Sequence, residues 1–88
     1  GMIVSNEPGF YLENKFGIRI ENLVYIDGNN KNLFLKNLTF APLEKDLIDE
    51  NLLTKNEKNY ILNYHLETYS KISPFLNNKE RRWLVKLI

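Results

Sequence analysis

The pattern of apolar and polar residues divides the chain near residue 42. Before this point the pattern repeats every second residue, most clearly over residues 17–27, where the apolar side chains fall mainly on one face. Pro8-Gly9 and Gly28-Asn29-Asn30 are turn signals that separate the extended segments. The first half therefore predicts an antiparallel β unit of about three to four strands. The expected strands are residues 2–7, 10–12, 17–27 and 33–40.

After residue 42 the apolar positions recur with the period of a helix. Thr54 and Glu57 form a capping box, in which the Thr hydroxyl accepts from the Glu amide and the Glu carboxylate reaches back. This predicts a helix that ends at Ser73-Pro74. Asn77 and Glu80 predict the start of a short terminal helix in the same way. The apolar positions of the longer helix are Tyr60, Ile61, Leu62, Tyr64, Leu66, Thr68, Tyr69 and Ile72.

These elements predict an α+β fold, in which the antiparallel β unit is followed by two C-terminal helices. We expect residues 1–42 to supply the strands and residues 43–88 to supply a helical extension, with both parts forming one structural unit. A chain of 88 residues is one small domain or a piece of a larger one.

Composition excludes several classes of function. The chain has no cysteine, so disulfides, thiolate metal sites and cysteine nucleophiles are excluded, and a reducing, cytoplasmic compartment is favoured. The single histidine, His65, excludes a site of several histidines within this chain. A net charge of +1 argues against binding to nucleic acid through bulk charge. No apolar run has the length of a membrane span.

Two short strings carry more specific information than composition. Residues 5–11 read SNEPGFY, and residues 17–22 read GIRIEN. Together they resemble the end of the catalytic domain of aminopeptidase P (Xaa-Pro aminopeptidase), a member of the creatinase and methionine-aminopeptidase superfamily. The resemblance implies a fragment of the "pita-bread" fold. It continues in order through LTFAP (38–42), LID (47–49), LT (53–54), NYH (63–65), SP (73–74) and WL (83–84).

The resemblance implies a role for three residues. Glu7 and Glu21 match two carboxylate ligands of a centre of two divalent ions, usually manganese, and Glu7 also matches a residue that moves a proton during catalysis. Carboxylate oxygens suit such hard ions. Arg19 lies two residues from Glu21 on the same strand face and is expected to orient that carboxylate. Tyr11 is expected on the substrate side. The implied substrate is a peptide with proline in second position.

Each of these residues also has a simpler interpretation. Without the wider pattern, Glu7 would be a solvated strand end, and Arg19 with Glu21 an exposed ion pair worth at most about 1 kcal/mol. His65 does not match the family's metal-binding histidine, so we expect it to pack or to form a hydrogen bond. Asp27, Asp46 and Asp49 do not stand in matching motifs.

Two hypotheses remain open at the level of sequence. In the first, the chain is the C-terminal segment of an Xaa-Pro aminopeptidase; since the remaining metal ligands would lie upstream, the chain alone is expected to be inactive and to bind no metal. In the second, it is a truncated remnant or a small non-catalytic oligomerisation module, for which Met2 would be the natural start and Gly1 a cleavage remnant. Strands cut from a larger sheet leave open edges, so a homo-oligomer is expected.

Overall fold

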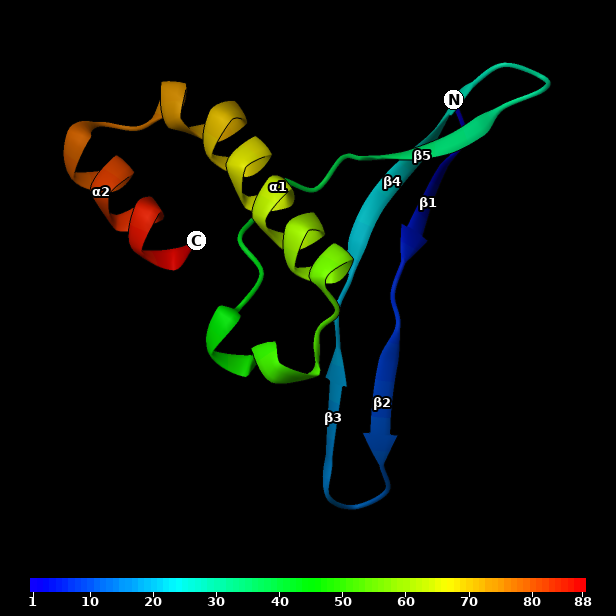
Figure 1. The fold of residues 1–88 in the computed structure, drawn as a ribbon, viewed down its shortest axis with the longest axis horizontal. Coiled ribbons are helices and arrows are strands. Elements are labelled where there is room, and N and C mark those ends of the chain that lie inside the picture. The colour runs from blue at the N-terminus through cyan, green and yellow to red at the C-terminus, as the bar shows by residue number, and fades with distance from the viewer. The chain divides into compact units, whose positions relative to one another are not determined.

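A computed structural model describes all residues from 1 to 88. The chain forms two compact units, Gly1–Thr39 and Phe40–Ile88. The first unit contains five β-strands and the second contains the helices, as the ribbon in Figure 1 shows. The predicted α+β class is therefore confirmed. None of the helices combines the length and the apolar character needed to cross a membrane.

The strands of the first unit form two antiparallel ladders. One sheet has the order β1-β4-β5, and the other is the pair β2-β3. Asn6 pairs with Asn22 at the end of the first ladder, and Gly9 pairs with Arg19 at the start of the second. Figure 1 shows the pair β2-β3 prolonging the ribbon made by β1 and β4. The strands are β1 (Ile3–Asn6), β2 (Gly9–Leu12), β3 (Phe16–Arg19), β4 (Asn22–Gly28) and β5 (Leu33–Asn37).

The prediction of one continuous strand over residues 17–27 is wrong. The strand is interrupted at Ile20 and Glu21, and on the opposite arm Glu7 and Pro8 lie between β1 and β2. One hydrogen bond spans this interruption, from the Ile20 N–H to the Pro8 carbonyl at 3.0 Å. Because proline has no N–H, the ladder cannot continue regularly there. Glu7 and Glu21 therefore face the same irregular stretch of the hairpin.

The turn between β4 and β5 depends on a glycine. Gly28 has φ 111°, and a Cβ at this position would lie 2.0 Å from the Asn32 carbonyl oxygen. The Asn29 side chain accepts hydrogen bonds from the N–H groups of Lys31 and Asn32 at 2.9 and 3.0 Å. The hairpin predicted at this site is thus confirmed, and it sets the register of β5 on β4.

The first unit buries few of its apolar side chains. Val24 is the one apolar residue of this unit that is buried. Exposed apolar area of this extent is typical of surfaces that other protein covers. The exposed residues are Met2, Ile3, Val4, Phe10, Tyr11, Leu12, Phe16, Ile18, Ile20, Leu23, Leu33, Phe34, Leu35 and Leu38.

The second unit is built on two capped helices, α1 (Lys55–Ile72) and α2 (Asn78–Leu87). Thr54 caps α1 and Asn77 caps α2, and both helices have the complete capping box predicted from the sequence. Tyr64, His65, Thr68 and Leu84 form the buried part of this unit. Three short 3-10 helices complete it: η1 (Lys45–Leu47), η2 (Glu50–Leu52) and η3 (Ser73–Phe75).

The apolar face predicted for α1 is only partly buried. Tyr64 and Thr68 are buried as expected, whereas Tyr60, Leu62 and Leu66 are exposed. The remaining apolar side chains of α1 thus add to the exposed surface.

Candidate metal centre

The two predicted ligand residues lie on opposite arms of the β hairpin, where both arms are irregular. Glu7 follows β1, and Glu21 lies between β3 and β4. The register that pairs Asn6 with Asn22 makes Glu7 and Glu21 neighbours across the ladder. Side chains at such opposite positions lie close enough to interact. The fold therefore brings together two carboxylates that are 14 residues apart in sequence (21 − 7).

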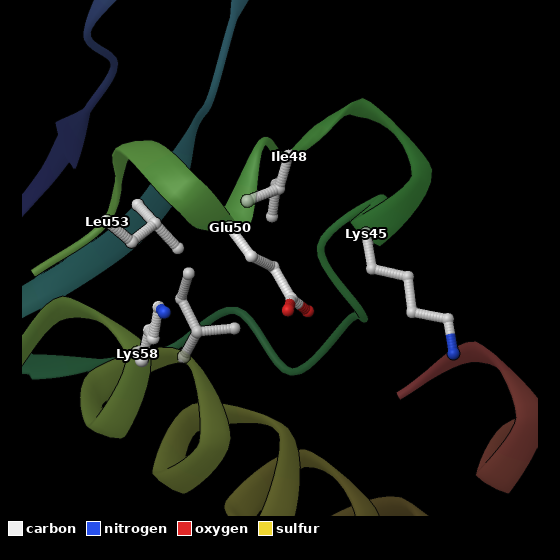
Figure 2. A pocket seen from close by; sticks show the side chains of 6 residues that line it. Lys45, Ile48, Glu50, Leu53 and Lys58 are labelled. Carbon is white, nitrogen blue, oxygen red and sulfur yellow. The ribbon is translucent and has the colours of Figure 1, made fainter. Parts of the chain in front are cut away.

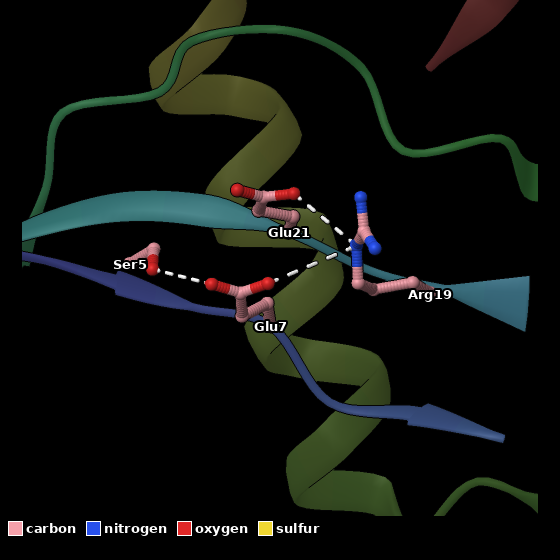
Figure 3. A network of polar contacts seen from close by, with 4 residues as sticks. All are labelled: Ser5, Glu7, Arg19 and Glu21. Carbon is pink, nitrogen blue, oxygen red and sulfur yellow. Dashed lines mark hydrogen bonds and ion pairs between the residues drawn. The ribbon is translucent and has the colours of Figure 1, made fainter.

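Arg19, the last residue of β3, lies between the two carboxylates (Figure 3). Its Nε atom is 3.2 Å from Oε2 of Glu21 and 3.9 Å from Oε2 of Glu7. All three side chains are about half exposed, at 50% for Arg19, 47% for Glu7 and 42% for Glu21. One guanidinium thus forms ion pairs with both carboxylates.

Ser5 supplies a further contact that the sequence motifs did not single out. Its hydroxyl donates a hydrogen bond of 2.6 Å to Oε1 of Glu7, the oxygen that does not face Arg19 (Figure 3). Glu7 is therefore held through both of its oxygens. The sequence signal for this contact is the spacing of Ser5 and Glu7, because residues two apart on an extended strand point to the same face.

Tyr11 forms a further contact with Arg19. The tyrosine lies across the β2-β3 ladder, directly opposite Gly17 and two residues from Gly9. A Cβ on Gly17 would come within 2.5 Å of the Tyr11 ring, and a Cβ on Gly9 within 2.6 Å of its hydroxyl oxygen. The two glycines thus leave the space in which the ring lies flat on the strands.

The contact with Tyr11 affects the pKa of Arg19. A side-chain hydrogen bond with Tyr11 raises the pKa of Arg19 above its ordinary value, and the negative charges of Glu21 and Glu7 raise it further. The guanidinium therefore keeps its charge at any physiological pH. The sequence does not predict this contact between Tyr11 and Arg19.

Replacing Gly17 with Ala tests whether this packing positions Arg19. The new methyl group would overlap the Tyr11 ring, so the ring must leave its place and its hydroxyl must leave Arg19. If Glu7 and Glu21 are ligands of a catalytic metal centre, we expect metal affinity and turnover of the complete protein to fall about 10-fold or more. Tyr11→Phe, which removes only the hydroxyl, should give a smaller loss. If Gly17→Ala retained wild-type affinity and turnover, the packing would have no positioning role.

The donor chemistry of this cluster fits a hard divalent ion. The Oε1 atom of Glu21 makes no hydrogen bond or ion pair, and carboxylate oxygens are the ligands that such ions prefer. No group of three or more His, Asp or Glu side chains in the chain is arranged to hold a metal ion. Glu7 and Glu21 are therefore suited to form part of a ligand set.

The other candidates for chemistry lie elsewhere. Asp27 pairs with Lys36 at 3.0 Å, and this contact lowers the pKa of the Asp27 carboxyl. His65 is buried on α1, and its Nε2 accepts a hydrogen bond from the Leu43 N–H at 3.1 Å. The expected packing and hydrogen-bonding role of His65 is thereby confirmed.

The second unit also contains a half-open cavity of about 200 Å³ (Figure 2). Its apolar floor is flanked by charged side chains, and it contains none of the residues predicted to carry chemistry. The lining residues are Lys45, Ile48, Glu50, Leu53, Lys58 and Ile61.

Comparison with known proteins defines the class to which this fold and this cluster belong. Residues 1–28 match the model of metallopeptidase family M24, and residues 31–87 match the model described as the C-terminal region of peptidase M24. The chain belongs to metallopeptidase family M24. Within this family it corresponds to a C-terminal segment of aminopeptidase P.

Individual relatives support the second statement. An uncharacterized peptidase of Schizosaccharomyces pombe is 46% identical over 98% of this chain and 16% of its own length. Aminopeptidase P2 of Arabidopsis thaliana is 41% identical over 96% of this chain and 13% of its own length. The chain therefore spans a small part of the relatives that it matches.

A solved structure confirms the fold. The crystal structure of X-prolyl aminopeptidase from Caenorhabditis elegans, described as a cytosolic enzyme with a di-nuclear active site, matches with a TM-score of 0.85 at 30% identity. The match covers 97% of this chain and 15% of that enzyme. The chain thus has the fold of the corresponding segment of a pita-bread aminopeptidase P.

Proposed function

We propose that this chain acts as the C-terminal part of a metal-dependent Xaa-Pro aminopeptidase, which hydrolyses the peptide bond before a proline in second position. In this proposal Glu7 and Glu21 are ligands of a centre of two divalent ions. The observation that carries the proposal is the cluster itself, in which Arg19 Nε lies 3.2 and 3.9 Å from two carboxylates on opposite arms of the hairpin.

The residues of the cluster would have different roles in catalysis. Two divalent ions would activate a water molecule and polarise the scissile carbonyl when bound. Glu7 and Glu21 would hold the ions, and Glu7 would also carry a proton to the leaving amine. Ser5 and Arg19 would fix the orientation of Glu7, and Arg19 that of Glu21, since outer contacts determine how a ligand is presented.

The cofactor, location and assembly of the intact enzyme follow from the same proposal. Manganese is the expected ion because the available donors are carboxylates, which suit Mn²⁺. The neighbour from Caenorhabditis elegans is described as cytosolic, and the same compartment is proposed here. The many exposed apolar side chains of both units favour burial against other protein, including a second copy.

A peptide assay on the complete natural protein tests the proposal. We expect release of the N-terminal residue from a peptide with proline in second position, and little or none from the same peptide with alanine there. A chelator should abolish the activity, and Mn²⁺ should restore it. The isolated 88-residue chain should release nothing, because two carboxylates alone cannot complete the centre. An inactive metal-loaded natural protein, or turnover by the isolated chain, would contradict the proposal.

The alternative is a non-catalytic oligomerisation module, and the exposed apolar surface is the observation that favours it. The two proposals predict different sizes for the natural polypeptide. An immunoblot against residues of α2 should detect a protein several times larger than 10.4 kDa if the chain works as part of the enzyme. A band near 10.4 kDa would instead favour the module.

A further inference from the structure

The segment that joins the two units, residues 40–43, is held against α1. The Tyr64 hydroxyl donates a hydrogen bond of 2.6 Å to the Ala41 carbonyl oxygen. The Lys71 ammonium lies 5.7 Å from the centre of the Phe40 ring, within the range of a cation–π contact. These contacts lie two turns apart on α1, so the connecting segment follows the helix over part of its length.

His65 provides the third contact, and this contact depends on its protonation state. Its Nε2 accepts the hydrogen bond from the Leu43 N–H, at 3.1 Å, so the proton of the neutral ring is on Nδ1. Protonation of Nε2 would convert this acceptor into a donor that faces another donor. His65 is 6% exposed and the hydrogen bond is partly buried, so protonation would leave the Leu43 N–H without its partner at a site with limited access to water.

We propose that His65 acts as a pH-sensitive latch, which holds residues 40–43 on α1 when the ring is neutral and releases them when it is protonated. The proposal does not depend on the proposed peptidase function. The titratable groups around the ring are Tyr64 on the same helix and Lys45 of η1, and no carboxylate is among its contacts. Histidine is the one side chain that ordinarily changes charge between about pH 5 and pH 8.

The electrostatic environment sets the direction of the switch. Burial lowers the pKa of His65 below its usual value of 6.5, and the positive charge of Lys45 lowers it further. At pH values well above 6.5 the ring is neutral in both the folded and the unfolded chain, so its protonation does not destabilise the latched form. As the pH falls below that value, the unfolded or released form takes up a proton first, and the latched form progressively loses stability.

The other end of the connection does not titrate. The Leu38 N–H donates to the Leu23 carbonyl, and the Leu23 N–H donates to Oγ1 of Thr39, both at 2.8 Å. These bonds fasten the connection to β4 at every physiological pH. Acid would therefore release only the end of the connection that lies on α1.

Hydrogen exchange at the Leu43 amide of the complete natural protein tests the latch. We expect its protection, corrected for intrinsic exchange, to fall about tenfold or more between about pH 7.5 and about pH 5. In His65→Gln the side-chain oxygen of the glutamine can still accept a hydrogen bond from the Leu43 N–H. The glutamine does not titrate, so the protection of the Leu43 N–H should be similar at both pH values. Amides in the middle of α2 should show no comparable change in either protein.

A pair of lysine variants provides a matched control that needs no change at His65. Lys45→Gln removes the charge that opposes protonation, so the midpoint of the Leu43 transition should move to higher pH. Lys58→Gln makes the same change at the nearby cavity and should leave the midpoint unchanged. Wild-type protection that did not vary with pH would overturn the proposal. Equal loss of protection throughout α1 and α2 would also overturn it, since it would indicate unfolding of the whole unit.

Discussion

Glu21→Gln is expected to lower the manganese affinity of the natural protein by about 100-fold or more, and its kcat/KM by at least as much. Glutamine has nearly the same shape but carries no charge, so it cannot neutralise two divalent ions. Loss of an outer contact to a ligand already costs about 10 to 100-fold, and loss of a ligand itself should cost more. Glu7→Gln should have an effect of similar size, because it removes both a ligand and the proposed proton carrier.

Calorimetric titration with Mn²⁺ and metal content after dialysis measure the first effect, and release of the N-terminal residue from an Xaa-Pro peptide measures the second. Glu13→Gln is the matched control, because Glu13 lies in the exposed turn between β2 and β3 and belongs to no ion pair. This variant should bind manganese and turn over substrate as the wild type does. Unchanged affinity in both Glu7→Gln and Glu21→Gln would refute the ligand assignment.

The sequence was sufficient to predict the elements whose signals are local. A capping box needs only a hydroxyl or amide side chain and a glutamate three residues later, so Thr54 and Asn77 located the starts of both helices. Gly28 and its asparagine neighbours likewise predicted the β4-β5 turn, because a positive φ is a local requirement. These signals do not depend on what the segment packs against.

The interruption of the long strand could not be predicted from alternation. Ile18, Ile20 and Val24 continue the period of two through the break, so the pattern gave no sign of it. The cause lies on the opposite arm, where Pro8 cannot donate to the ladder. Only the pairing register reveals that this proline lies across from Ile20.

The sequence predicted which residues form the candidate site but not how their side chains are arranged. The motifs identified Glu7, Arg19 and Glu21, and alternation placed Arg19 and Glu21 on one face. The contact between Arg19 and Glu7 depends on the register between two arms, which alternation alone does not fix. The position of Tyr11 depends in addition on the absence of side chains at Gly9 and Gly17, a requirement that becomes visible only in three dimensions.

Arg19 provides the second prediction with a large expected effect. Its Nε is within 3.9 Å of both carboxylates, and the remaining guanidinium nitrogens can reach other acceptors such as the Tyr11 phenol. A lysine would keep the charge but present a single nitrogen on a flexible stem, without the planar fork. We therefore expect Arg19→Lys to lower metal affinity and kcat/KM of the natural protein by about 10 to 100-fold.

Comparison with Arg19→Ala separates the role of geometry from that of charge. If Arg19 acts by positioning Glu7 and Glu21, the lysine variant should recover little of what the alanine variant loses, in metal affinity as well as in turnover. The side chain is half exposed, so neither variant should unfold the protein, which circular dichroism can verify. Arg82→Lys makes the same chemical change on the exposed surface of α2 and should have no effect. Wild-type affinity and turnover in Arg19→Lys would mean that its charge, and not the fork between the two carboxylates, supports the site.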